Sequence, residues 1–206
     1  MTKYLIVNAD DFGYSHSINK GIIEAHKRGI VTSTSVMVNA IAADEAKDLT
    51  KYPNLSVGLH FELKEVVDVE AELKRQIEKF VAIVGKKPDH IDTHKRHTTD
   101  EGIREVLETY PKTHNIPVRI FNAKHIGSFG VNSNDGSVAQ LKRSIDETTD
   151  ENNELMTHCG YSDDYLRKHS SYSDPREQEL ASILDPSIQE YIRDKGLQLI
   201  NWRQIA

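Results

Sequence analysis

The chain has 206 residues, a formal net charge of -6, one cysteine and ten histidines. The acidic balance excludes a general nucleic-acid binder and a protein held on an anionic membrane, because both need a concentrated basic surface. One cysteine cannot form an internal disulfide, and no apolar run approaches the roughly 20 residues of a membrane span or resembles a signal peptide. We therefore expect a cytoplasmic protein with a small-molecule partner and with no nucleic acid and no membrane partner. The sequence is compatible with a homo-oligomer.

Short β-rich runs alternate with longer segments of helical period, which is typical of a parallel sheet with helical crossovers. The expected strands are, in chain order, residues 3–9, 32–38, 55–61, 89–93, 117–121, 154–158 and 197–201. The expected helices are residues 17–28, with Gly29 as the C-cap, and residues 67–85, 99–110, 137–148 and 175–194. Seven or eight such units favour an α/β fold: a distorted or incomplete (β/α) barrel, TIM-barrel-like, in a single domain. Two polar loops, residues 127–136 and 163–175, could border a cleft.

Four of the expected strands end in residues that can bind a metal or move a proton. Asp10 and Asp11 end the first strand, and His60, His94 and His158 end three others. Taken singly, an Asp-Asp pair would as readily cap a helix, and a strand histidine is more often structural than a ligand. In a barrel, however, chemistry sits at the carboxyl ends of the strands, so we expect these five side chains to converge on one pocket.

The five side chains divide into a metal-binding set and an acid-base pair. Asp11, His60 and His94 would supply one carboxylate and two imidazoles, which leaves positions open for water and substrate. Adjacent residues of a strand point to opposite sides, so Asp10 would be free to take a proton from the attacking water. His158 could protonate the leaving group from another strand. The pattern predicts a metal-assisted hydrolase; two histidines favour zinc, and magnesium stays open.

Asp92 and Arg119 each have two interpretations. Asp92 alternates with His94 along an extended segment. It either hydrogen-bonds a metal-binding histidine and so fixes the orientation of its ring, or it belongs to an ordinary polar strand end. Arg119 lies on the expected fifth strand, where it is either a surface charge or the residue that holds Asp10 ionised from within the barrel.

Three other residues have a functional interpretation that we consider weaker. Cys159 adjoins His158 and could act as a nucleophile, but neighbours on a strand point in opposite directions. Tyr161 and Trp202 could stack on a sugar ring, although packing explains each of them more readily.

Six short segments carry a resemblance to a known family. They are Ile6–Gly13, Gly21–Ala25, Gly29–Ser35, Gly58–Phe61, His90–His94 and Met156–Tyr161, the last with Cys159 where a proline is usual. Together these segments resemble the YdjC-like carbohydrate deacetylases, a family that includes chitooligosaccharide deacetylase. The similarity extends from residue 3 to about residue 165.

The resemblance implies that residues 1–206 form one YdjC-like deacetylase domain. It implies a divalent metal ion, Mg²⁺ or Zn²⁺, bound by Asp11, His60 and His94. It also implies removal of an N-acetyl group from an acetylated amino sugar or short oligosaccharide, with Asp10 as the base and His158 as the acid. These roles agree with those expected from the residues alone.

The chain departs from the family pattern in two places. Lys95, Arg96 and His97 stand where the family often has further histidines, which predicts a more basic rim and a preference for a different or anionic sugar. The segment between His60 and His90 is shorter than is typical, which predicts a more open cleft. Two alternative functions remain: a metal-dependent phosphoesterase, and a sugar-binding protein on the same fold without turnover.

Overall fold

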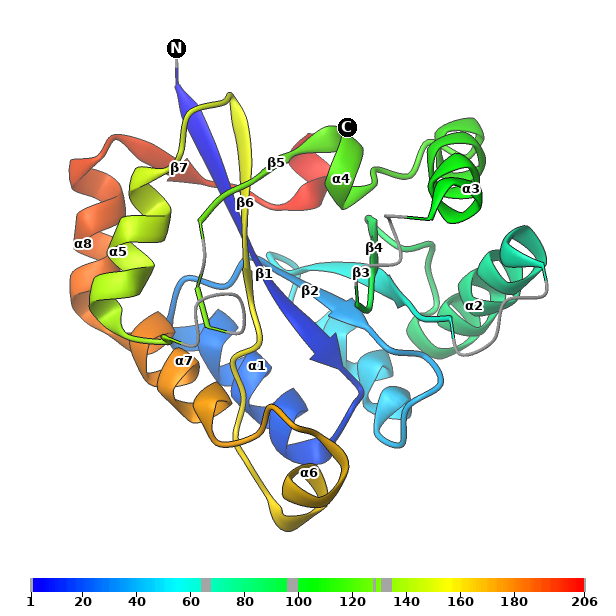
Figure 1. Cartoon of the computed structure of the whole chain (residues 1–206), viewed down its shortest axis with the longest axis horizontal. Helices are drawn as coiled ribbons and strands as arrows, with labels where there is room; N and C mark the ends of the chain where they lie inside the picture. Colours follow the sequence, from blue (N-terminus) through cyan, green and yellow to red (C-terminus); the bar gives the residue numbers. More distant parts are fainter. Residues whose placement is uncertain (1, 64–67, 96–99, 128, 131–134, 206) are drawn as a thin grey trace.

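A parallel sheet forms the centre of the computed structural model, which describes residues 2–63, 68–95, 100–127, 129–130 and 135–205. Its strands are β1 (Lys3–Phe12), β2 (Ser33–Val36), β3 (Ser56–Phe61), β4 (Ile91–Thr93), β5 (Lys124–His125), β6 (Asn152–Thr157) and β7 (Leu197–Leu199). The strands pair in the order β4-β3-β2-β1-β6-β5, with β7 beside the first half of β1. The sheet curls into a half-barrel surrounded by helices, so the expected incomplete (β/α) barrel is confirmed (Figure 1).

Two groups of helices cover the half-barrel. The helices are α1 (His16–Arg28), α2 (Val69–Val84), α3 (Glu101–Thr113), α4 (Arg119–Asn122), α5 (Val138–Asp146), α6 (Asp164–His169), α7 (Pro175–Leu184) and α8 (Pro186–Asp194), with 3-10 turns at Ala43–Lys51 and Trp202–Gln204. In Figure 1, α1, α5, α7 and α8 lie on the side of β1 and β6, whereas α2 and α3 lie beyond β3 and β4. Among the described residues, each helix is too short or too polar to cross a membrane.

The first helix follows directly from its sequence. The side chain of Ser15 accepts a hydrogen bond from the backbone N–H of Ile18 at 3.2 Å, which satisfies a donor left free at the N-terminus. Ile18, Ile22 and Ala25 recur at helical spacing and are buried. The N–H of Gly29 donates to the carbonyl of Ala25 at 3.0 Å, so the expected C-cap is confirmed.

The expected single helix over residues 175–194 is two helices in the structure. Pro186 has no N–H to donate and restricts the residue before it to extended conformations. Asp185 accordingly has φ -66° and ψ 121°, and its side chain caps α8 by accepting from the N–H of Ser187 at 2.8 Å. The apolar period continues across the break because both helices pack on the same core, which is why the periodicity alone suggested one helix.

The expected fifth strand at residues 117–121 is wrong. Val118 makes only an isolated parallel bridge to Ile91, and residues 119–122 form the short helix α4. The side chain of Asn122 accepts the N–H of Val118 at 2.8 Å, which favours this local turn over an extended strand. The fifth strand lies further on, at Lys124–His125.

The end of β1 departs from a regular strand at the acidic pair. Asp11 has a φ of +71°, and the pairing of β1 with β2 shifts register between Ala9 and Phe12. A left-handed backbone costs about 1–2 kcal/mol for a residue with a Cβ. The expectation that Asp10 and Asp11 point to opposite sides is therefore wrong, because the irregularity lets both carboxylates face one cavity.

Candidate metal and acid-base site

A cavity of about 1030 Å³ lies at the carboxyl ends of the strands. Its wall includes all five side chains that the strand-end pattern singled out: Asp10, Asp11, His60, His94 and His158. β1 and β3 deliver the first three, and the last two come directly after β4 and β6. The structure thus brings together residues from four strands.

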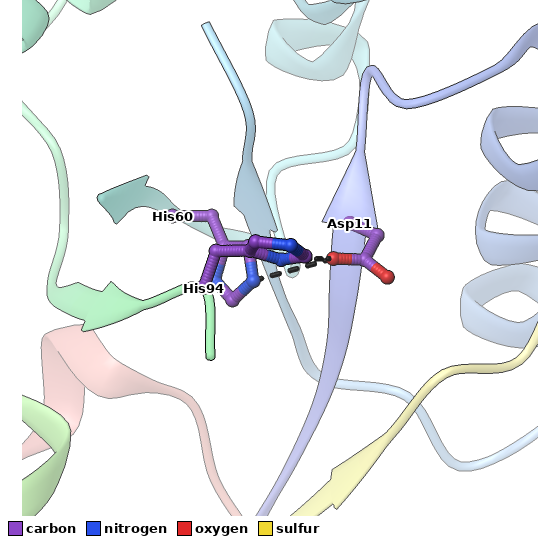
Figure 2. A group of neighbouring side chains, drawn as sticks. All are labelled: Asp11, His60 and His94. Atoms are coloured by element: carbon purple, nitrogen blue, oxygen red, sulfur yellow. Dashed lines mark ion pairs between the residues drawn. The ribbon is translucent and has the colours of Figure 1, made fainter. Parts of the chain in front are cut away.

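Asp11, His60 and His94 form the metal-type cluster of this cavity. Oδ1 of Asp11 lies 3.2 Å from Nε2 of His60 and 3.4 Å from Nδ1 of His94. Figure 2 shows both imidazoles directed at this carboxylate. Within the described residues, Asp11 Oδ1 is buried and accepts no hydrogen bond. A buried carboxylate oxygen that faces two imidazole nitrogens, with no other donor among the described residues, fits a divalent metal ion.

Asp92 orients the His60 ring from behind. Its Oδ1 lies 2.6 Å from Nδ1 of His60, and both side chains are buried. A proton on Nδ1 leaves the lone pair of Nε2 directed at Asp11, as in the carboxylate–histidine pairs behind many metal ligands. Without a metal ion, burial lowers the pKa of His60, but the carboxylates of Asp92 and Asp10 outweigh burial and raise it to about 10. A metal ion bound at Nε2 would therefore displace a proton from that nitrogen.

Arg119 holds Asp10 from inside the half-barrel. Its Nη1 donates to Oδ2 of Asp10 at 2.9 Å and its Nη2 donates to Oδ1 at 2.5 Å. Burial raises the pKa of Asp10, but Arg119, helped by His60, lowers it below its ordinary value. Asp10 is therefore ionised at neutral pH and able to accept a proton. Of the two interpretations of Arg119, the structure supports the inward one, although on a helix instead of a strand.

The same guanidinium fills a second acidic cluster. Asp10, His60 and Asp92 also have ligand-type atoms within 4.8 Å of one another. Arg119 Nη2 lies 2.7 Å from Oδ2 of Asp92, and Nε lies 2.8 Å from Oε1 of Glu154, so this cluster already surrounds a cation. A second metal ion there would meet the guanidinium charge, which favours one ion beside Asp11.

A backbone hydrogen bond and a ring contact fix the position of His158. Its N–H donates to Oε2 of Glu179 at 2.8 Å, and its ring meets Tyr172 edge to face at 5.9 Å. Within the described residues, Nδ1 of His158 is buried without a hydrogen-bond partner. Among the residues that the structure describes, no carboxylate forms an ion pair with this ring as Asp92 does with His60.

Sequence reasoning missed Arg176 and Glu179, which α7 delivers to the site. Arg176 Nη2 donates to Oδ2 of Asp11 at 2.6 Å. Burial raises the pKa of Asp11, but Arg176 and the two imidazoles lower it well below its ordinary value. The sequence did contain a signal for them. Arg176 and Glu179 lie three residues apart, on the same face of α7 as the apolar residues Leu180 and Ile183. Charged residues on the apolar face of a helix are rarely buried unless they are paired.

The rim of the cavity includes a basic residue from the segment after β4. Lys95 lies there and is exposed, whereas Arg96 and His97 fall outside the described residues. Lys124, His125 and His169 also line the cavity, although the sequence analysis did not single them out. Lys124 lies 3.6 Å from Asp150, and burial lowers the pKa of His125. The expected loop over residues 163–175 does border the cavity, but it contains α6.

The weaker interpretations do not fit the geometry. Burial raises the pKa of the Cys159 thiol to about 12, so it carries no thiolate at neutral pH. Trp202 is fully buried and stacks on His90 with ring centroids 4.9 Å apart. Tyr161 donates its hydroxyl to Glu24. None of these three side chains lines the cavity.

Sequence comparison identifies the family. The profile of the family described as YdjC-like protein matches residues 4–67 and 64–194. A carbohydrate deacetylase of Clostridium beijerinckii is 33% identical over 244 residues, covering 98% of this chain and 99% of the relative. A chitooligosaccharide deacetylase of Proteus mirabilis is 31% identical over 215 residues, covering 81% of this chain and 85% of the relative. The chain belongs to the YdjC-like family.

Solved structures show the same fold. A protein of Enterococcus faecalis V583, described as a candidate cellobiose-phosphate cleavage protein, superposes with a TM-score of 0.89 at 24% identity over the whole of both chains. A family 4 carbohydrate esterase from Streptomyces lividans, solved with acetate, gives 0.63 at 15% identity, covering 96% of this chain and 91% of that one.

The alignment also bears on the short segment between His60 and His90. The 244 aligned positions of the Clostridium relative exceed the 206 residues of this chain, so that relative has insertions. The two segments of the family match meet at residues 64–67, inside the region between His60 and His90. The expected shortening between His60 and His90 and the more open cleft both stay predictions.

Proposed function

We propose that the protein is a metal-dependent carbohydrate deacetylase that removes an N-acetyl group from an acetylated amino sugar or short oligosaccharide. The observation that carries the proposal is the buried Oδ1 of Asp11, which lies 3.2 Å and 3.4 Å from ring nitrogens of His60 and His94, beside the ionised Asp10. Family membership and the two related deacetylases support it.

The residues of the site have distinct roles in this proposal. A divalent metal ion, Mg²⁺ or Zn²⁺, held by Asp11, His60 and His94 would polarise the acetyl carbonyl and lower the pKa of the attacking water. Asp10 takes the proton from that water, since Arg119 keeps its carboxylate ionised.

Departure of the amine completes the proposed reaction. His158 donates a proton to the nitrogen that leaves, and the products are acetate and a free amine. Its place in the same cavity wall as Asp10 supports this role. The two groups come from β1 and from the segment after β6, so each can act on a different atom of the amide.

Acetate release tests the proposal directly. Incubation with N,N'-diacetylchitobiose or a related N-acetylated sugar and a divalent metal should release acetate, and a chelator should stop the release. Neutral, acidic and phosphorylated amino sugars belong in the panel, because the basic rim would attract an anion by forces that salt screens. No acetate from any member would contradict the proposal.

The basic rim supports a second candidate, a metal-dependent phosphoesterase. Lys95 could attract a phosphate, and the metal-type cluster could polarise a phosphoryl oxygen as well as a carbonyl oxygen. Metal-dependent phosphate release from a phosphoester, without acetate release from the sugars, would favour this function. Saturable sugar binding without either product would instead indicate the non-catalytic sugar-binding alternative.

A further inference from the structure

Arg176 on α7 joins three separate segments of the cavity wall. Its side chain is buried, and each guanidinium nitrogen donates to a different segment. Nη2 binds Oδ2 of Asp11 at 2.6 Å, Nη1 binds the carbonyl of His158 at 3.3 Å, and Nε binds the carbonyl of Tyr172 at 2.8 Å. The acceptors lie on β1, after β6 and in the loop before α7.

The contact with Arg176 makes the two carboxylate oxygens of Asp11 unequal. Oδ2 is engaged by the guanidinium, whereas Oδ1 accepts no hydrogen bond from the described residues and lies between the imidazoles of His60 and His94. A carboxylate can offer a metal ion either one oxygen or both. An ion pair on Oδ2 disfavours the second mode, because the guanidinium occupies one side of that oxygen and places a positive charge beside it.

We propose that Arg176 is a positioning residue that makes Asp11 bind the metal ion through one oxygen only. Coordination positions on the ion then stay free for water and for the acetyl carbonyl. This inference rests on the proposed function, since it requires a divalent metal at Asp11, His60 and His94. An arginine suits the task because its planar guanidinium serves acceptors on three segments in a fixed geometry, whereas a lysine could supply only the ion pair with Asp11.

A merely structural role for Arg176 leads to different expectations. If the arginine only stabilised the fold, its loss would weaken metal binding while leaving the number of ligands unchanged. If it positions Asp11, its loss frees Oδ2 and removes a positive charge near the metal site. The metal ion then binds as tightly as before or more tightly, and the number of its ligands rises. Turnover falls because the second oxygen of Asp11 occupies a coordination position that water or substrate needs.

Cobalt can separate these two roles, because its visible absorption weakens as the number of ligands rises. The variants are Arg176→Met, which removes the guanidinium, and Arg176→Lys, which keeps a positive charge that can reach Asp11. Arg75→Met is the matched control, since Arg75 makes a two-point ion pair with Glu72 at 2.7 Å on the exposed face of α2. Each protein is titrated with Co²⁺ by calorimetry and spectroscopy, and kcat and KM are measured for acetate release.

We expect Arg176→Met to bind Co²⁺ at least as tightly as the wild type, with weaker visible absorption per bound ion. Its kcat should fall by about tenfold or more, as is usual when a partner of a metal ligand is lost, with a smaller change in KM. Arg176→Lys should keep the wild-type spectrum, and Arg75→Met should match the wild type throughout.

Several results would overturn the positioning role. An unchanged spectrum in Arg176→Met would do so, whether Co²⁺ binding is unchanged or weaker. If that variant does not fold, Arg176→Gln decides, because its side chain is polar but too short and uncharged to keep the ion pair with Asp11. Weaker absorption per bound ion in Arg176→Gln supports the role, and a wild-type spectrum contradicts it. Wild-type protein that releases acetate and binds Co²⁺ separates a failure of this inference from a failure of the proposed function.

Discussion

Replacing Glu154 by glutamine should remove a pH-dependent loss of stability. Glu154 lies on β6, is fully buried, and accepts the Nε of Arg119 at 2.8 Å. Burial raises its pKa from 4.5 to about 8, although Arg119 opposes the shift. Between these two values the folded protein binds a proton that the unfolded chain has released. The free energy of unfolding therefore falls as the pH rises through this window.

The expected size follows from the same pKa. Between pH 6 and pH 9 the folded carboxyl loses nearly all of its proton, while the unfolded carboxyl is already ionised at both values. This difference corresponds to about 2–3 kcal/mol of stability lost by the wild type and not by Glu154→Gln. The variant keeps the size of the side chain and leaves an amide where Oε2 already lacks a partner among the described residues. Any cost of that amide is the same at both pH values.

Urea denaturation of metal-free protein at pH 6 and pH 9 measures the effect. The stability of Glu154→Gln relative to the wild type should rise by about 2–3 kcal/mol between the two conditions. Glu190→Gln on α8 makes the same chemical change at an exposed position and should show no such rise. A constant difference between wild type and Glu154→Gln would refute the reasoning.

Four further substitutions test the site and its supports. Asp10→Asn and His158→Ala should retain bound metal and lower acetate release by about a hundredfold or more, since both are proposed as acid-base groups. Asp92→Asn should weaken metal binding by about 10–100-fold in calorimetry, because it removes the carboxylate that orients a ligand imidazole. Gly58→Ala should lower the melting temperature strongly, because its Cβ would lie 2.2–2.5 Å from three ring atoms of the buried His90.

Each of these predictions has an opposing outcome. Loss of metal in His158→Ala, measured by elemental analysis, would make that histidine a ligand instead of an acid. Unchanged metal affinity in Asp92→Asn would show that packing alone orients His60. The control for Gly58→Ala is Gly102→Ala in α3, where a Cβ would meet its nearest neighbour at an ordinary 3.4 Å. Equal melting temperatures of the two alanine variants would contradict the steric argument.

Local sequence determined the elements of the half-barrel and the ends at which chemistry gathers. Apolar runs of strand length, the helical spacing of Ile18, Ile22 and Ala25, and the capping glycine Gly29 are all short-range signals that depend on neighbouring residues. The placement of ligand-type residues at strand ends was equally visible, because parallel strands bring their carboxyl ends to one edge. The sequence therefore predicted which five side chains would share a cavity.

Tertiary structure decided how those side chains are oriented and which distant residues support them. Asp11 pairs with Arg176, which lies 165 positions further along the chain, and Asp10 pairs with Arg119 at a separation of 109 positions. The left-handed backbone of Asp11 breaks the alternation that a regular strand would impose. Such partners come together only when helices pack on the curled sheet, since buried charges must find counter-charges wherever the fold places them. Periodicity within a segment carries no information about that placement.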